Sequence, residues 1–495
     1  MNVKKTFKKL VLASMSLALV GTLAACGGLT GDKQKSKKSD KASGDTTTLT
    51  MYRVGEKPKN YDELMEVVNK RMKDEIGAEL NIQYIGWGDY QNKMSVITSS
   101  GEDYDIAFAD SYVSTAQKGA YKDLTELAPK YAKETYDNLN PTYIEGNKVD
   151  GKLYAIPVNA NVFAQRVMTF DKELVDKYDL DISKVKTIAD LEPLLKVIKE
   201  NEPNVSPFPA GKDIRMGNFD YVYDVNVPLG IDLEGDKTKI INPYADSPRM
   251  KRDLADMHTL FAKKYIPQDA ATSDELYRLD DKTWFVRVET QGPYDYGDTI
   301  LTRAAGRELV SVPLTTPLKD NGQMFVANWV ISNTSKNAEK ALEAINLINT
   351  DQDLLATMVF GKEGEGWEKV GDDHMKTLPG YDASNKVIGG AWMTGDNNKI
   401  FLDEKITDEM VAERDEKIEA AEQSPLLGFN FNAENVKTEI TNLSNVTGQY
   451  KAGLSTGTLD PDKAIPEFNA KLEEAGLKKV QEEMQKQFDE FMKDK

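Results

Sequence analysis

The period of the hydrophobic residues changes several times between residues 48 and 110, and this pattern constrains the fold more than any other feature. Segments with the two-residue period of a strand alternate with segments that have the 3.6-residue period of a helix. The strand-like segments are 48–54, 78–85 and 104–110, and the helix-like segments are 60–77 and 89–101. Because strand–helix–strand order favours parallel pairing through right-handed crossovers, the sequence predicts an α/β protein.

The predicted helix over residues 60–77 carries signals at both ends. Asn60 and Glu63 have the spacing of a capping box, in which both side chains accept hydrogen bonds from backbone amides at the start of a helix. Gly77 follows the last apolar position and is typical of a helix stop. We therefore expect a well-bounded helix between the first two strands.

Chain length and charge limit the class of protein. The roughly 470 residues that would remain after removal of a leader are too many for one hydrophobic core, so two lobes are expected. The formal net charge is −18, which makes nucleic acid and anionic lipid poor partners because both require a basic surface. With 40% hydrophobic and 29% charged residues, the composition is that of an ordinary globular protein.

The only cysteine of the chain, Cys26, stands at the end of an N-terminal apolar segment that follows four lysines. The segment is about 14 residues long, which is shorter than the ~20 residues of a membrane-spanning helix. A charged start, an apolar stretch and small residues predict that residues 1–25 are a secretory signal peptide. The tetrapeptide Leu-Ala-Ala-Cys resembles the lipobox of bacterial lipoproteins, which implies lipidation of Cys26. The alternative is a lone buried or reactive thiol.

Residues 26–47 contain Gly, Ser, Lys and Asp and almost nothing apolar, so they are predicted to form a flexible tether behind the lipidated cysteine. The folded part then begins near Thr48. A single cysteine also excludes a disulfide within the chain, which fits a fold that is held by a large core. Contact with the membrane is expected through the lipid anchor only.

Polar and aromatic side chains follow the predicted strands at their carboxyl ends, where open parallel sheets bind ligands. Trp87 and Asp89 follow the second strand, and Asp110 and Tyr112 follow the third. Aromatic faces and carboxylate acceptors suit a neutral polar ligand, so we expect these four residues to contact one. The alternative is that Trp87 packs in the core and that the aspartates cap helices.

No pattern of catalytic or metal-binding residues stands out, and no catalytic residue, metal or cofactor is predicted. The chain has two histidines, His258 and His374, which lie far apart in sequence and have no neighbouring cysteine. There is no H-E-x-x-H motif, no G-x-S-x-G elbow and no phosphate-binding Walker loop. A surface glycoside hydrolase remains an alternative because it needs only two carboxylates, and the sequence has 81 acidic residues. A cation-binding lipoprotein is disfavoured because residues 179–192 lack the D-x-D-x-D-G pattern.

Several longer segments resemble bacterial extracellular solute-binding proteins of the maltodextrin and oligosaccharide group. The most specific matches are D-G-K-x-Y-x-x-P at 150–157 and S-K-N-x-x-x-A-L at 335–342, and weaker ones occur at 99–127, 168–181, 187–200 and 261–272. These matches span much of the chain between residues 48 and 495. The resemblance implies a two-lobed α/β clamp in which each lobe is a mostly parallel sheet flanked by helices.

Such proteins close on a ligand at a hinge and deliver it to the permease subunits of an ABC importer. The resemblance implies hinge crossings near 158, 316 and 365. One lobe would then comprise residues 48–158 and about 316–365, and the other 159–315 and about 366–495. It further implies an oligosaccharide ligand, a monomer and a location on the extracellular face of a Gram-positive cell membrane. Peptide binding by the same fold stays open, because aromatic rings also cover peptide side chains.

The resemblance also implies ligand contacts beyond the strand ends. The segment 282–298 resembles the family's G-P-aromatic stretch, whose ring stacks on a sugar. The implied ligand residues after the first crossing are Asn159, Asp220, Tyr221, Glu289, Tyr294, Trp392, Phe429 and Asn430. Rings would cover the apolar faces of a pyranose, while carboxylates and amides would bind its hydroxyls.

The end of the chain is predicted to be helical and charged from Asp403 onward. The part from Pro425 to the end resembles a C-terminal region found in a Gram-positive subset of these lipoproteins. Within that subset, the overall likeness is to the binding subunits of importers for N-glycan fragments from host glycoproteins. The sequence therefore favours a sugar-binding protein without fixing which sugar it binds.

Overall fold

The structure is a computed structural model that describes residues 46–494 except 213, 274–276 and 384. Cys26, the predicted signal peptide and almost all of the predicted tether lie outside the described residues. Within the part that is described, no helix is both long and apolar enough to cross a lipid bilayer.

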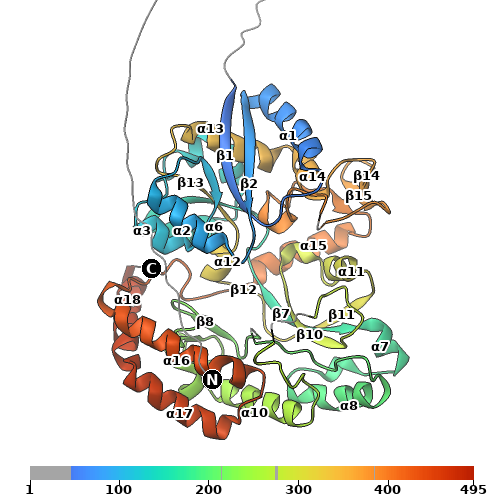
Figure 1. The fold of residues 1–495 in the computed structure, drawn as a ribbon, viewed down its shortest axis with the longest axis vertical. Helices are drawn as coiled ribbons and strands as arrows, with labels where there is room; N and C mark the ends of the chain where they lie inside the picture. Colours follow the sequence, from blue (N-terminus) through green and yellow to red (C-terminus); the bar gives the residue numbers. More distant parts are fainter. Residues whose placement is uncertain (1–45, 213, 274–276, 384, 495) are drawn as a thin grey trace, which may run out of the picture. The chain divides into compact units, whose positions relative to one another are not determined.

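A five-stranded sheet forms the centre of the half of the molecule that carries β1 and β2 in Figure 1. Its order is β2-β1-β3-β13-β6, built from β1 (Thr47–Val54), β2 (Ala78–Ile85), β3 (Ile106–Phe108), β6 (Ala155–Pro157) and β13 (Asn328–Ile331). β1 pairs in parallel with β2 and β3, which confirms the strand–helix–strand prediction. β13 pairs antiparallel with β3 and β6. The chain leaves this sheet after β6 and returns as β13. Because β13 runs opposite to both of its neighbours, the sheet is mixed.

Helices α1 (Tyr61–Ile76) and α2 (Tyr90–Ser100) form the predicted crossovers. Gly77 ends α1 with a positive φ of 64°, as the sequence predicts, and glycine adopts this conformation at little cost. The predicted capping box is wrong, because the Asn60 side chain makes no capping hydrogen bond. Asn60 has a ψ of 28°, whereas a capping residue takes an extended backbone that aims its side chain at the first amides of the helix.

A second sheet has the order β10-β7-β11, from β7 (Gln165–Asp171), β10 (Val286–Gln291) and β11 (Leu309–Pro313). Both outer strands pair antiparallel with the central β7. The expectation of a mostly parallel sheet in each lobe is therefore wrong here. β7 lies between two strands that come later in the chain, and both enter the sheet from the opposite end, so no direct strand–helix–strand crossover joins neighbours.

The remaining elements are short strands, surface helices and a helical C-terminal region. The other strands are β4 (Lys148–Val149), β5 (Lys152–Leu153), β8 (Phe219–Tyr221), β9 (Gly230–Asp232), β12 (Leu318–Lys319), β14 (Trp367–Val370), β15 (His374–Thr377), β16 (Leu402–Asp403) and β17 (Glu422–Gln423). The other α-helices up to Phe325 are α3 (Tyr112–Gln117), α4 (Ala128–Tyr131), α5 (Lys133–Asn138), α6 (Pro141–Gly146), α7 (Lys172–Lys177), α8 (Glu192–Asn201), α9 (Pro243–Asp246), α10 (Pro248–Ala262), α11 (Thr299–Ala305) and α12 (Asn321–Phe325). Those after it are α13 (Ala338–Thr350), α14 (Gln352–Phe360), α15 (Asp408–Ala420), α16 (Lys437–Ser455), α17 (Pro461–Glu474) and α18 (Leu477–Asp494). The last four, α15 to α18, confirm the helical region predicted from Asp403 onward.

Two large hydrophobic cores underlie the two main sheets. The first contains the apolar faces of β1, β2 and β3 together with Trp329, Trp367 and Phe401. The second contains Phe170, Phe285 and the inner faces of α16, α17 and α18. Figure 1 shows α16–α18 beside α10 and β8. The C-terminal helices therefore share the core of the second sheet, although more than a hundred residues separate them from it in sequence.

Candidate functional site

The chain passes between the two cores several times, and a small apolar cluster marks the crossings. Val162 and Phe163 from the first crossing contact Met324, Leu427 and Tyr143 in this cluster. β12 and β17 pair in parallel beside it, so the later crossings run side by side. Two cavities include residues of the first crossing, and one of them is lined from both halves of the molecule, as a ligand cleft requires.

One such cavity has a volume of about 500 Å³ and aromatic walls. Its ring-bearing residues come from separate segments, and polar groups lie between them. The lining includes Asn161, Tyr294, Tyr296, Arg303, Tyr381, Trp392 and Asp403. The volume falls in the ~300–1,000 Å³ range of small-molecule sites, and the mixture of rings and polar groups suits a ligand with both apolar and polar faces. We name this space the aromatic cavity.

Trp87 and Trp392 form a stacked pair next to the aromatic cavity. Their ring centroids are 6.2 Å apart and their planes differ by 20°. Trp87 is 61% exposed and Trp392 is 39% exposed, so neither indole is a core side chain. The backbone carbonyl of Trp392 accepts a hydrogen bond of 2.9 Å from Asn161 Nδ2. The expected alternative for Trp87, packing in the core, is thus excluded.

Tyr294 and Tyr296 meet edge to face, with ring centroids 6.5 Å apart. The guanidinium carbon of Arg414 on α15 lies 5.0 Å from the Tyr294 ring and 5.7 Å from the Tyr296 ring. Arg414 Nη1 also donates a hydrogen bond of 2.9 Å to Tyr296 Oη. Burial raises the pKa of both tyrosines above its usual value, so both hydroxyls stay protonated at neutral pH.

Two carboxyl groups accompany the aromatic residues: Asp295 is half-buried and lines the aromatic cavity, and Asp396 is buried. Burial raises the pKa of Asp295 to about 6, although the Gly292 amide donates a hydrogen bond of 2.5 Å to its Oδ2. Burial also raises the pKa of Asp396 to about 6, against the hydrogen bonds from the Asn398 amide and from Asn159 Nδ2. The latter bond is 2.9 Å long. The side-chain amide of Asn159, a predicted ligand residue, is therefore already hydrogen-bonded to Asp396.

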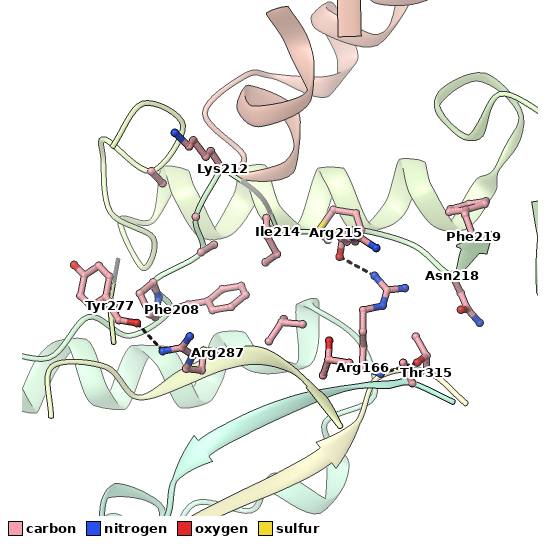
Figure 2. Close-up of a pocket in the computed structure, with 18 of the residues that line it drawn as sticks. Arg166, Phe208, Lys212, Ile214, Arg215, Asn218, Phe219, Tyr277, Arg287 and Thr315 are labelled. Carbon is pink, nitrogen blue, oxygen red and sulfur yellow. Dashed lines mark hydrogen bonds between the residues drawn. The ribbon is translucent and has the colours of Figure 1, made fainter. Parts of the chain in front are cut away.

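A second cavity of about 940 Å³ shares Asn161 with the aromatic cavity. Its walls include Arg166, Phe208, Phe219, Tyr221, Tyr277 and Arg287. Figure 2 shows the Arg166 and Arg287 side chains on the wall formed by the second sheet, with Phe208 between them and Tyr277 beside Arg287. We name this space the arginine cavity. Because one residue lines both, the two cavities adjoin.

The arginines of this wall are held by backbone oxygens. Arg166 Nη1 donates to the carbonyl of Arg215 at 2.9 Å, and its Nη2 donates to the carbonyl of Gly217. Burial, together with the nearby charges of Arg249 and Arg215, lowers the pKa of Arg166 to about 10, so it remains charged at neutral pH. Arg287 donates to the carbonyl of Tyr277 at 2.7 Å. Guanidinium groups fixed in this way present their other N–H groups to a ligand.

Asp220 and Tyr221, both predicted to bind ligand, differ in position. Tyr221 is half-buried and lines the arginine cavity, and burial raises the pKa of its hydroxyl to about 12. Asp220 is buried and accepts a hydrogen bond from Ser424 Oγ. Burial and the negative charge of Asp320 raise the pKa of Asp220 to about 8. The hydrogen bond between Ser424 and Asp220 thus connects the segment after β17 to β8 in the second half. The Asp220 carboxyl is protonated near neutral pH.

Glu289 pairs with Arg287 through Arg287 Nε on β10. Burial raises the pKa of Glu289, and the positive charge of Arg287 opposes that rise. Arg287 lines the arginine cavity while Glu289 does not. Glu289 therefore contacts the cavity residue Arg287 without lining the cavity itself.

Besides Trp87, Asn159, Asp220 and Glu289, five further predicted site residues line neither cavity. Tyr112 is 5% exposed, and its hydroxyl donates to the carbonyl of Asn147 in the first core. Asp110 is half-buried beside Tyr121, with burial raising its pKa. Asp89 is exposed and forms an ion pair of 3.2 Å with Lys93.

Phe429 and Asn430, the other two, lie at the start of the C-terminal region. Phe429 packs on Phe488 and Phe491 of α18. Asn430 Nδ2 donates to the carbonyl of Lys148 at 2.8 Å. Both residues fasten the C-terminal region to the rest of the molecule and contribute to neither cavity.

Several cavity residues have no clear signal in the sequence. Asn161 and Arg166 follow the predicted first crossing directly, so their place at a hinge was their only detectable signal. Arg414 lies in α15, and the many charged residues of this helix predict an exposed surface helix and not part of a site. Among the described residues, no group of three or more His, Cys, Asp or Glu side chains is arranged to hold a metal ion.

A fold with two cores, a cleft beside the crossings and aromatic rings in that cleft defines the class of a solute-binding clamp. A model of bacterial extracellular solute-binding proteins matches residues 55–244, and a domain of unknown function (DUF3502) matches residues 425–493. A carbohydrate ABC transporter substrate-binding protein of Streptococcus pneumoniae serotype 4 is 48% identical over 99% of this chain and 100% of its own length. The chain therefore belongs to the bacterial extracellular solute-binding protein family.

Solved structures agree with this assignment. The crystal structure of the N-glycan transport solute binding protein NgtS from Streptococcus pneumoniae is 48% identical, with a TM-score of 0.87 over 90% of this chain and 99% of that one. NgtS in complex with Man5GlcNAc gives a TM-score of 0.81 over 91% of this chain and 99% of that one, again at 48% identity. The two-lobed clamp predicted from the sequence is thus confirmed as the fold.

Proposed function

We propose that the protein is the substrate-binding component of an ABC importer and captures extracellular oligosaccharides of the N-glycan type. The carbohydrate-binding relative and the Man1GlcNAc and Man5GlcNAc complexes of NgtS support this ligand class. The observation on this chain that carries the proposal is the exposed, stacked pair Trp87 and Trp392 beside the aromatic cavity. Exposed rings at a cavity mouth are costly to leave in water and provide flat faces for pyranose C–H groups.

The proposed ligand contacts combine predicted residues with residues that only the structure identifies. Trp87, Trp392 and Tyr294 supply rings, and Tyr221 and Asn161 supply hydrogen-bonding groups. Arg166 and Arg287 are the cations proposed to bind hydroxyls in the arginine cavity. Asn159, Asp220 and Glu289 are proposed to support these groups without touching the ligand, because each already binds another side chain. Each hydrogen bond to a desolvated hydroxyl is worth about 0.5–1.5 kcal/mol.

We further propose revised lobe boundaries. Trp367, Met375, Ile388 and Phe401 pack in the first core, and Leu426 packs in the second. The last crossing is therefore placed between Phe401 and Leu426 instead of near residue 365. The first lobe then contains roughly residues 46–158 and 327–401, and the second contains roughly 165–313 and 426–494. Ligand binding closes the lobes, because only the closed form lets a ligand contact both.

The proposed setting is the outer face of the cell membrane. Removal of residues 1–25 and lipidation of Cys26 would anchor a monomer through a flexible tether, and the closed lobes would present the ligand to permease subunits. Relatives are substrate-binding transport proteins. We accordingly propose that the protein binds oligosaccharides without cleaving them.

Isothermal titration calorimetry of the chain from residue 26 onward tests this proposal. The panel contains Man1GlcNAc, Man5GlcNAc, a maltodextrin and an unrelated pentapeptide. The expected result is saturable one-to-one binding of the mannose-containing ligands, with each ligand recovered intact by mass spectrometry. Binding of the peptide alone would reassign the ligand class, and shortened glycans would indicate a hydrolase.

A further inference from the structure

Arg53 on β1 is an unusual arginine because it is fully buried without an ionic partner. Its exposed fraction is 0%, and among the described residues it forms no salt bridge. Its Nη1 has no hydrogen-bond partner, and burial lowers its pKa to about 10. A buried cation without a counter-ion destabilises a folded protein. Such a residue is therefore expected to serve a purpose other than stability.

The guanidinium of Arg53 contacts the segment 389–394, which carries Trp392. Arg53 Nη2 donates to Thr394 Oγ1 at 2.7 Å and to the Met393 carbonyl at 3.4 Å. Thr394 Oγ1 in turn donates to the Gly390 carbonyl at 2.7 Å, which closes the turn around Trp392. Arg53 thus binds the two residues that follow the exposed indole, and Thr394 connects it to Gly390 on the other side.

The surroundings of the guanidinium hold it in this position. Its central carbon lies 5.3 Å from the Trp329 ring, and Trp329 Nε1 donates to the Thr394 carbonyl at 3.2 Å. A Cβ atom on Gly389 would lie 1.7 Å from Arg53 Nη2, so the guanidinium fills the space that a side chain would take. Tyr84, the register partner of Arg53 on β2, donates to the Ile388 carbonyl at 3.0 Å.

These contacts connect the sheet to both members of the indole pair. Trp87 follows β2 directly, whereas Trp392 is far away in sequence and reaches it through the segment 389–394. We propose that Arg53 is a positioning residue that holds Trp392 against Trp87 before the ligand arrives. The expected effect on affinity rests on the proposed function, because a preformed pair of rings binds a sugar more tightly than one that must be ordered on binding.

Arg53→Met tests the inference, because methionine removes the charge and the hydrogen bonds but retains an apolar side chain. Replacing a buried unpaired cation in this way leaves stability similar or higher. The expected result is an unchanged or raised Tm with a roughly tenfold weaker oligosaccharide affinity, which corresponds to about 1.4 kcal/mol. In a Trp392→Ala background the same change is expected to cost nothing further.

A second readout needs no ligand. Two stacked indoles give a coupled circular-dichroism signal, identified here by its loss in Trp87→Phe and Trp392→Phe. Arg53→Met and Gly389→Ala are both expected to weaken this signal. Arg307→Met is the matched control: the Arg307 side chain is 6% exposed and its guanidinium lies 4.6 Å from the Trp284 ring, but it pairs with Asp171 in the other half. It should lower Tm and leave both the signal and the affinity unchanged.

The two readouts separate this inference from the proposed function. If the wild type binds no saccharide while Arg53→Met loses the indole signal, the proposed function fails and the positioning role of Arg53 stands. If Arg53→Met and Gly389→Ala both keep the signal and the wild-type affinity, the inference is overturned. Should Arg53→Met fail to fold, Gly389→Ala and Arg53→Lys decide the outcome by the same two measurements.

Discussion

Trp87 and Trp392 stack at a centroid distance of 6.2 Å from segments that are remote in sequence, and both rings remain open to solvent. A fold that exposes two tryptophans side by side forgoes the free energy that would be gained by burying them. The stacked pair connects the end of β2 in the first lobe to the segment 389–394 and offers flat apolar faces to a ligand in the cleft.

Trp87→Ala is expected to weaken oligosaccharide affinity roughly three- to tenfold, because a ring contact is worth about 0.5–1.5 kcal/mol. Thermal stability should hardly change, since the side chain is 61% exposed. Calorimetry and a melting curve measure the two effects. Trp367→Leu is the control, because Trp367 is 2% exposed in the first core and should lose stability but retain affinity. Loss of stability without loss of affinity in Trp87→Ala would assign this ring to packing.

Arg414→Gln is expected to weaken ligand binding by displacing Tyr294 and Tyr296. The guanidinium contacts both rings, and each cation–π contact is worth about 0.5–2 kcal/mol. Affinity for the oligosaccharide is measured by calorimetry. Lys417→Gln on the same helix is the control, because Lys417 is exposed and pairs with Glu413. Equal affinities for the two variants would remove Arg414 from the site.

The Asp220 carboxyl predicts a dependence of stability on pH. Its pKa is raised from 3.8 to about 8 in the folded protein, so the folded state binds a proton that the unfolded state releases between these values. The stabilisation is therefore fully present below about pH 3.8 and is lost as pH rises towards 8. A single such group changes the free energy of unfolding by up to roughly 1.4 kcal/mol per pH unit.

Asp220→Asn provides the comparison for that dependence. The neutral amide should raise Tm at pH 8 relative to wild type, and its Tm should decline less steeply between pH 5 and pH 8. The charge of Asp320 faces Asp220 and raises its pKa, and the charges of Arg166 and Arg215 oppose the rise in the pKa of Asp320. Parallel Tm profiles for wild type and variant would show that Asp220 is ionised throughout this range.

Phe488→Ala on α18 is expected to destabilise the protein by about 3–5 kcal/mol, because Phe488 is 1% exposed and belongs to the second core. Urea unfolding measures this change. Met492→Ala, also on α18 but 43% exposed, should have little effect. A loss below 1 kcal/mol for Phe488→Ala would mean that the C-terminal helices are not part of the second lobe.

The sequence predicts the first lobe well because its signals are local. The periods of residues 48–110 match β1, α1, β2, α2 and β3, and Gly77 ends α1 where a glycine stop is expected. Strand direction in the second sheet is not a local property. It depends on where β7, β10 and β11 enter the sheet, and long connections between them leave no trace in the period of any one strand.

The candidate site was predictable only in part, for a similar reason. Trp87 and Tyr294 stand at strand ends or in a recognisable motif, and the structure places them at the aromatic cavity or beside it. Tyr112 occupies an equivalent strand end, yet its ring turns into the core and its hydroxyl bonds to Asn147. Which way a side chain faces after a strand is decided by tertiary packing. Arg53 carries no sequence signal because the groups that accept its hydrogen bonds lie more than three hundred residues away.

Small-angle X-ray scattering of the chain from residue 26 onward, with and without a saturating oligosaccharide from the panel above, tests lobe closure most directly. The radius of gyration is expected to be smaller with the bound ligand, because the lobes close over it. An unchanged radius of gyration at full saturation would contradict a clamp that closes on its ligand.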